Sequence, residues 1–399
     1  MSESKNLITT FIAKSIGLVA SFMLVMISTK IWGTSGRGYI SLITADASIL
    51  CVITNLFAGG AFMYHINKIG VKKLFPFALI WICCISLIGA FFIAWHQEVE
   101  WGLVFAFTIA ISLSSLLNNY LLNQLRFGLV NLLTVAYNLL FVVATGYLLY
   151  WEVSVNWTSY FWLNTIFLLA MSVIPLIQLL KETNIQFEFL SKTDVRALFQ
   201  YGWKNELSYF LQFLSYRVSY FFIFYYIGVK SLGVFGILVL IGESIWVVSR
   251  SIATVQYATL LNTESEEESR TKTNRYALYS LCVTLVAIGF VFLIPESLII
   301  KLLNKDFAGF LSYFIVLAPG VLAIGVSTVY GHYFSARNRQ WILVIKSFFG
   351  FIAALLLTPV FIHYYGLWGA ALAMSLSYCI SSVILTWAYF SKRYRINEK

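Results

Sequence analysis

The sequence predicts an all-α integral membrane protein, with twelve transmembrane helices arranged as two six-helix lobes. The first supporting observation is composition: 60% of the 399 residues are apolar and 11% are charged, whereas soluble domains carry about 25% charged residues. The second is that the apolar residues gather in stretches of roughly 18–28 residues, a length that spans a bilayer as a helix. The third is a bias of basic residues towards alternate connections. These observations exclude a soluble fold and place the function among the helices.

The first stretch is predicted to be a spanning helix rather than a cleaved signal peptide. Its apolar part is longer than that of a signal, it contains Lys14, and no small-residue cleavage site follows. Six stretches precede the longest connection, 181–197, and six follow it. The predicted spans, in order, are 7–32, 39–64, 74–95, 101–124, 128–150, 157–180, 198–228, 232–260, 276–300, 308–335, 341–364 and 366–390.

The connections alternate in charge. Those on the side of the N-terminus, such as 65–73, 181–197 and 261–275, carry seventeen of the 27 basic residues, and those on the opposite side carry five. Short cytoplasmic loops are enriched in Lys and Arg. We therefore expect a multi-pass membrane protein with both termini cytoplasmic, which requires an even number of spans.

A faint internal repeat supports the division into halves. Gly33 and Gly38 separate the first two spans, Gly228 and Gly233 separate the seventh and eighth, and an acidic residue follows each pair. The predicted lobes are 1–190 and 191–399. An even number of helices in each half implies a pseudo-two-fold axis along the membrane normal, as in transporters with parallel repeats. We expect a cavity where the halves meet.

Metal, redox and nucleic-acid chemistry find no support in the sequence. The cysteines and histidines are scattered through or beside apolar runs, without a CxxC or HExxH spacing: Cys51, Cys83, Cys84, Cys282, Cys379, His65, His96, His332 and His363. The net charge of +10 comes mainly from the biased connections. We expect no cofactor, no metal and no nucleic-acid partner, and a monomeric chain.

Ionisable residues inside the apolar stretches are the candidate functional residues. Each costs about 2.5–3.5 kcal/mol at a membrane midplane on insertion scales, so a charge retained there usually has a role. Lys14 lies on a polar stripe of the first span, Arg217 lies deep in the seventh, and Arg250 in the eighth. Lys204, Lys346 and Arg37 lie nearer to span ends, where snorkelling or plain solvation is the alternative. The acidic counterparts are Asp46 and Glu243, for which a proton site, a sodium site and a structural ion pair all remain open.

Three segments resemble one family of exporters. The turn Trp32–Tyr39 resembles a "lGp.GrGyy" element, the segment from Tyr216 to Trp246 resembles the corresponding helices of the second half, and Tyr365–Ala373 is similar to a "yGi.GAaiat" helix start. These are features of the MOP superfamily, in particular of its lipid-linked oligosaccharide (O-antigen) flippases. The resemblance implies two six-helix lobes, a cationic cavity with alternating access, and a polyprenyl-diphosphate-linked glycan as substrate. Ser219 stands where relatives often carry Asp.

The predicted function is therefore a flippase of lipid-linked glycan rather than an enzyme. Arg and Lys are natural phosphate ligands, so Lys14 and Arg217 are predicted to bind the diphosphate, and Arg250, Lys204, Lys346 and Arg37 to line the path. Asp46 and Glu243 are predicted to couple transport to H⁺ or Na⁺. Expected partners are membrane lipid, the lipid-linked glycan and glycan polymerase or assembly proteins. The alternatives are a multidrug exporter, which the cationic tilt disfavours, and a membrane glycan polymerase or acyltransferase, for which no catalytic cluster is visible.

Overall fold

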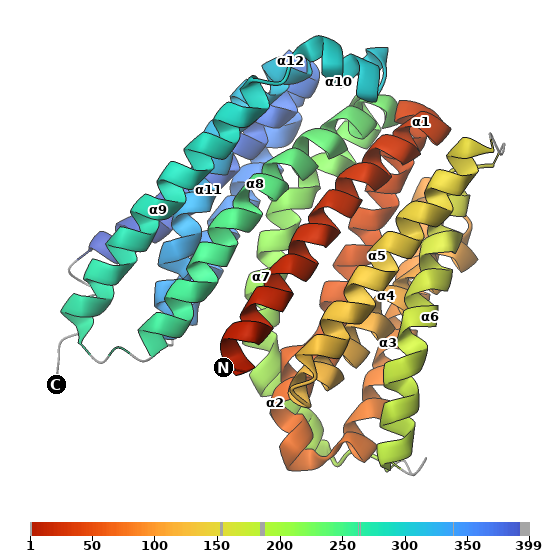
Figure 1. Cartoon of the computed structure of the whole chain (residues 1–399), viewed down its shortest axis with the longest axis vertical. Coiled ribbons are helices and arrows are strands. Elements are labelled where there is room, and N and C mark those ends of the chain that lie inside the picture. Colours follow the sequence, from red (N-terminus) through yellow and green to blue (C-terminus); the bar gives the residue numbers. More distant parts are fainter. Residues whose placement is uncertain are drawn as a thin grey trace. The chain divides into compact units, whose positions relative to one another are not determined.

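The described part of the chain is helical from end to end. The computed structural model describes residues 2–151, 155–183, 188–261, 263, 265–337 and 339–391, and the side chains of 2–8, 10, 11, 14, 204, 205, 258 and 261 lie outside the description. The helices, shown in Figure 1, are α1 (Ser2–Ala58), α2 (Gly60–Ile69), α3 (Val71–Gln97), α4 (Trp101–Asn123), α5 (Phe127–Tyr150), α6 (Thr158–Thr183), α7 (Lys192–Tyr226), α8 (Val229–Leu261), α9 (Glu266–Phe292), α10 (Glu296–Leu302), a 3₁₀ turn η1 (Lys305–Phe307), α11 (Phe310–Ala336) and α12 (Gln340–Phe390).

Two of these helices are each a pair of predicted spans joined at a glycine. The backbone leaves the helical region at Gly33 (φ 67°, ψ −175°) in α1 and at Gly366 (φ 57°, ψ −133°) in α12. At the first break the chain turns back on itself. The guanidinium of Arg37, after the break, lies 3.4 Å from the hydroxyl of Ser28, before it. In Figure 1 the red α1 rises from the N-terminus and returns towards α2. Gly33 falls between the predicted spans 7–32 and 39–64, and Gly366 is the first residue of the predicted span 366–390.

The twelve-helix prediction is confirmed in this form. Among the described residues, nine helices are long and apolar enough to cross a membrane, and α1 and α12 are each long enough to cross twice. The twelfth is α7, which is 35 residues long but too rich in polar residues to be among those nine. The ninth predicted span, 276–300, is shifted: α9 begins at Glu266 and ends at Phe292, and the short α10 follows.

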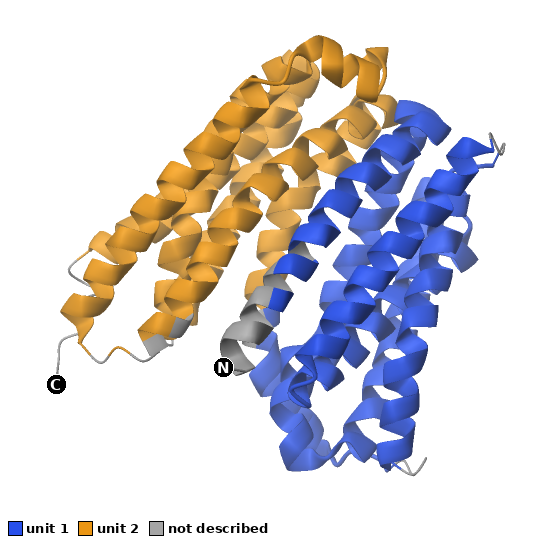
Figure 2. Cartoon of the chain, in the orientation of Figure 1, with its two compact units in different colours: residues 1–206 blue, residues 207–399 orange. Residues whose placement is uncertain are grey.

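The chain divides into two compact units (Figure 2), unit 1 over Met1–Glu206 and unit 2 over Leu207–Lys399. This boundary lies within α7, further along the chain than the predicted boundary between residues 190 and 191. The physical reason is packing at the start of α7. Leu198 is fully buried in a cluster of unit 1, and Gly202 lies against the backbone of Leu56. The first turns of α7 therefore belong to unit 1.

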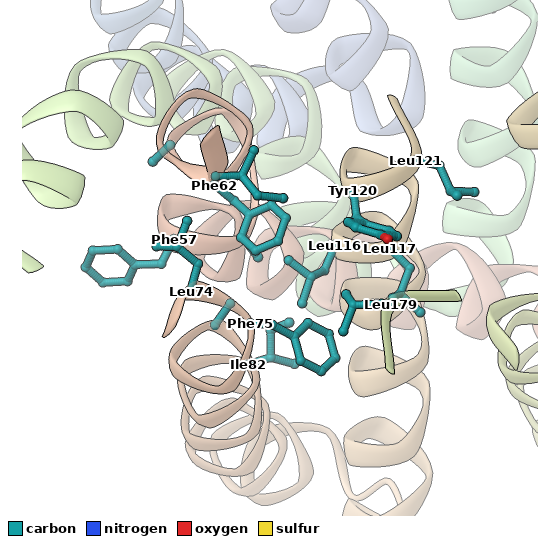
Figure 3. Close-up of a cluster of buried hydrophobic side chains, with 14 of the residues drawn as sticks. Phe57, Phe62, Leu74, Phe75, Ile82, Leu116, Leu117, Tyr120, Leu121 and Leu179 are labelled. Carbon is teal, nitrogen blue, oxygen red and sulfur yellow. The ribbon is translucent and has the colours of Figure 1, made fainter. Parts of the chain in front are cut away.

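A large apolar cluster organises unit 1 where α1, α2, α3, α4 and α6 meet (Figure 3). Phe62, Phe75 and Leu116 are almost completely buried in it. The outward face of α3 is equally apolar but exposed, with Ile88, Phe92 and Trp95 each at least 66% exposed. A helix that is apolar on both its inner and its outer face is typical of a protein surrounded by lipid.

Unit 2 is tied together at one end by a polar network that we call the Glu266 clasp, formed by Glu266, Arg270, Tyr333, Arg337 and Tyr389. The Glu266 carboxylate lies 3.8 Å from Arg270 and 3.6 Å from Arg337, and accepts a hydrogen bond from the Tyr333 hydroxyl. The Arg270 guanidinium lies over the Tyr389 ring at 4.5 Å and donates to the Tyr389 carbonyl at 2.7 Å. The clasp joins the ends of α9, α11 and α12.

The turn within α12 generates a prediction about three glycines. Gly366 has positive φ, a Cβ at Gly369 would collide with the carbonyl of Phe361, and a Cβ at Gly289 in α9 would meet nothing within 4 Å. Gly366→Ala is expected to cost about 1–2 kcal/mol of stability through backbone strain, and Gly369→Ala more than that through the collision. Gly289→Ala is the matched control and should be neutral or stabilising, since alanine is the better helix former by about 1 kcal/mol.

Thermal unfolding of the three purified variants in detergent measures this order. An unchanged midpoint for both Gly366→Ala and Gly369→Ala would contradict the geometry of the turn.

Candidate functional site

The deepest charges of unit 2 form an ion pair between α7 and α8. The Arg217 Nη2 atom lies 2.8 Å from Glu243 Oε1 and 3.1 Å from Oε2, and the two side chains are 18% and 23% exposed. Arg217 also donates to the Tyr220 hydroxyl at 3.2 Å and lies near the faces of the Phe213 and Tyr220 rings, at 5.5 and 5.1 Å. The charge of Arg217 is thus balanced by a carboxylate and covered by aromatic rings.

Aromatic side chains continue from this pair across three helices. Tyr216 of α7, Trp246 of α8 and Tyr378 of α12 contact one another: the Tyr216 ring centroid is 5.0 Å from that of Trp246 and 5.2 Å from that of Tyr378, and the last two are 5.7 Å apart. Gln212, one turn earlier on α7, donates to the Tyr216 hydroxyl. The Tyr378 hydroxyl is buried and makes no hydrogen bond to a described residue. The three rings are buried against one another and join α7, α8 and α12 within unit 2.

A second group of charges in unit 2 is cationic without a carboxylate. Arg250 of α8 and Lys346 of α12 are close enough to interact electrostatically, and both interact with His332 of α11. Arg250 also interacts with Tyr216. In the described part of the chain, neither Arg250 nor Lys346 has an ion-pair partner. We call Arg250, Lys346 and His332 the cationic cluster.

His332 is held in a defined orientation within this cluster. Its Nδ1 lies 3.0 Å from the Thr328 carbonyl, and its ring meets the ring of Tyr257 edge-on at 6.1 Å. A donor at Nδ1 leaves Nε2 available for another partner. The sequence did not single out His332, because a lone histidine gives no signal until the fold brings it to Arg250 and Lys346.

The acidic residue predicted in unit 1 lies in a different environment. Asp46 is 6% exposed, and its Oδ2 accepts a hydrogen bond from the Gln97 amide at 2.7 Å. In the described residues it has no ion-pair partner. A buried carboxylate with one neutral donor is costly when ionised, so Asp46 fits the predicted proton or cation site in chemistry. Its role in ion coupling stays a prediction.

Arg37 is part of the turn of α1 rather than a freely solvated charge. It donates to the Ser28 hydroxyl and lies close enough to Tyr160 to interact electrostatically with it. The side chains of Lys14 and Lys204 lie outside the described residues, and the structure places only their backbones, in α1 and α7. The predicted binding roles of these three residues stay predictions.

Unit 1 contains an uncharged polar pocket between α4, α5 and α6, with a cavity volume of about 200 Å³. Its polar lining consists of Ser114, Asn118, Thr134, Tyr137, Asn138 and Ser172. Several of these side chains already bond within unit 1, such as Tyr137 to Asn164 at 2.8 Å and Asn138 to the Thr134 carbonyl at 2.8 Å. The pocket suits water or a neutral hydroxylated group, and sequence periodicity gave no indication of it.

Comparison with solved structures identifies the fold. The chain is similar to an inward-facing multidrug resistance MATE family transporter of the MOP superfamily, with a TM-score of 0.75 at 13% identity over 95% of this chain and 97% of that one. It is similar to the lipid II flippase MurJ in an inward closed conformation, with a TM-score of 0.67 at 16% identity over 96% and 87%. It is also similar to a MOP superfamily transporter from Pyrococcus furiosus, with a TM-score of 0.62 at 12% identity over 96% and 93%.

No family model matches the sequence, and no curated protein matches it. The likeness therefore concerns the fold: the chain has the architecture of MOP superfamily transporters and is a multi-pass membrane protein. The resemblance read from the sequence is confirmed at that level.

The ion pair between Arg217 and Glu243 generates a stability prediction. Glu243→Gln leaves a guanidinium without its counter-charge in a low-dielectric region, and breaking a buried pair from one side costs about 3–5 kcal/mol. Lys230→Met is the matched control, because Lys230 pairs with Asp306 at 2.6 Å but is 62% exposed, and exposed pairs contribute below about 1 kcal/mol.

Unfolding midpoints in detergent distinguish the two variants. Equal small losses for Glu243→Gln and Lys230→Met would show that the Arg217–Glu243 pair contributes no more than a surface contact.

Proposed function

We propose that the chain is a flippase that moves a polyprenyl-diphosphate-linked oligosaccharide across the bacterial cytoplasmic membrane by alternating access. The cationic cluster carries this proposal: Arg250 and Lys346 lie together in unit 2 and lack an acidic partner among the described residues. Arg250 is exposed and Lys346 is half-buried, and two like charges held close together repel each other. A diphosphate that binds there supplies the missing counter-charge.

The structure changes the emphasis among the predicted ligands. Arg217 already has Glu243 as its counter-charge at 2.8 Å, so it has less positive charge to offer a phosphate. We therefore assign the diphosphate to Arg250 and Lys346, with His332 as a further donor, and give Arg217 and Glu243 the role of positioning α7 against α8. Lys14 and Lys204 remain additional candidates on the substrate path.

The glycan part of the substrate is matched by neutral groups. The pocket of unit 1 offers amides and hydroxyls without charge. Asp46 remains the proposed residue for coupling to H⁺ or Na⁺. Membrane lipid would hold the polyprenyl tail, and a glycan polymerase or assembly protein would use the product on the far side.

A multidrug exporter is the second candidate, because the structure with a TM-score of 0.75 is a multidrug resistance transporter. Cationic drugs need an acidic and aromatic site, whereas the unpaired charges in unit 2 are basic. A drug-susceptibility assay separates the two candidates: a raised resistance that survives loss of Arg250 and Lys346 would favour drug export.

The test of the flippase proposal is the double variant Arg250→Ala with Lys346→Ala. Each charged contact to phosphate contributes about 1.5–3 kcal/mol, so the pair should lower glycan export about 100-fold or more while the protein remains in the membrane. Arg275→Ala is the matched control, since Arg275 is exposed at the start of α9 and bonds to Tyr279.

Export is measured as lipid-linked glycan that reaches the outer leaflet, and membrane insertion is measured by immunoblot of the membrane fraction. Wild-type export by the double variant would overturn the assigned diphosphate site.

A further inference from the structure

The second span of unit 1 is broken where α1 ends and α2 begins. α1 ends at Ala58, α2 begins at Gly60, and Gly59 between them has non-helical angles (φ −98°, ψ −126°). The break lies inside the apolar cluster of Figure 3, which includes Phe57 and Phe62 on either side of it. In such surroundings water is not available to bond the backbone groups that a break releases.

The break leaves several carbonyl groups without their helical partners. The Asn55 carbonyl accepts from the Gly59 N–H at 2.8 Å, and the Ala58 carbonyl accepts from the Asn119 side-chain amide at 3.0 Å. The helix does not continue past Gly59, so the carbonyls of Leu56 and Phe57 lie in the last turn of α1. The last carbonyls of a helix have no partner within that helix, and a helix C-terminus also carries partial negative charge.

The face of α7 that packs on this break adds a carboxylate. Gly202 lies so close that a Cβ on it would be 2.5 Å from the Leu56 carbonyl oxygen. Glu206, one turn later on the same face of α7, points to Gly59. The position that a Gly59 Cβ would take is 3.3 Å from Glu206 Oε1 and 2.6 Å from the Asn55 carbonyl oxygen. The notch at Gly59 is therefore bordered by a carboxylate oxygen and a main-chain carbonyl.

Glu206 is half-buried and has no hydrogen-bond donor and no basic partner among the described residues. The ionisable group that faces it from α1 is the Cys51 thiol. A carboxylate in this position is costly unless a cation accompanies it. Asp46 and Glu243, the acidic residues singled out from the sequence, differ in this respect, because they are bonded to Gln97 and Arg217.

We propose that the notch at Gly59 is a binding site for a monovalent cation, Na⁺, held by the Glu206 carboxylate and by main-chain carbonyls at the end of α1. Hard cations take oxygen ligands, and broken membrane helices bind Na⁺ through carbonyls freed by the break. Gly59 is required because a side chain there would fill the notch. The bound cation holds α7 against the broken span, whichever substrate the protein carries.

The experiment measures ²²Na⁺ binding to the purified full-length chain in detergent, with choline replacing Na⁺ as the inert salt. The wild-type protein is expected to bind about one displaceable Na⁺ per chain and to unfold at a higher temperature as Na⁺ rises. Glu206→Gln should lower the Na⁺ affinity at least tenfold and abolish the Na⁺-dependent rise. Glu206→Asp keeps the charge but withdraws the oxygen atoms from the notch, so it should retain weaker binding.

The matched control is Glu188→Gln, a carboxylate of unit 1 that is 57% exposed and pairs with Lys73; it should bind Na⁺ as the wild type does. Asp46→Asn should also retain binding, which separates this site from the one predicted at Asp46. The proposal is overturned if the wild type binds no Na⁺, if Glu206→Gln binds it unchanged, or if the melting temperature responds through Glu206 to pH but not to Na⁺. The last outcome would show that Glu206 binds a proton in the notch rather than Na⁺.

Discussion

Low dielectric around lipid-embedded helices is the constraint on which the rest of this structure depends. With no water beside the backbone, each departure from a helix must be made where sterics allow it and where another group bonds the freed atoms. The chain meets this requirement with glycines of positive φ at Gly33 and Gly366. At the Gly59 break it relies partly on the amide of Asn119. Turns and breaks are thus few, local and chemically supported.

The same constraint sorts the charged side chains into two kinds. Arg217 and Glu243 neutralise each other at 2.8 Å and are covered by rings, so their contribution is mainly architectural. Arg250, which is exposed, and Lys346 and Glu206, which are half-buried, have no opposite charge among the described residues. A fold bears such a cost where a ligand offsets it during function, so the unbalanced charges are more informative about function than the balanced ones.

Much of the fold follows from the sequence because bilayer thickness fixes helix length. The twelve spans, the turns at Gly33 and Gly366 and the division near α7 could all be predicted from apolar run lengths and glycine positions. Helix ends were less accurate, as at α9, since helices extend beyond the apolar core.

The site was predictable only as a set of charges. The partner of Arg217 stands 26 residues away on the next helix, and no local pattern distinguishes Glu243 from other acids. His332 became a candidate because Lys346 of another helix lies near it, and Glu206 because it lies beside Gly59. Contacts of this kind depend on helix rotation and on where a helix breaks, which composition and periodicity do not determine.

The Glu266 clasp has a mechanical consequence. It fastens α9, α11 and α12 at one end through charges and a ring stack, and pulling them apart would strand those charges. The joined ends of α9, α11 and α12 must therefore move together as one rigid body. Bending within unit 2 is therefore expected away from the clasp, at Pro319 in α11 and Pro359 in α12. Proline has no backbone N–H, so the helix lacks one hydrogen bond there and bends more easily.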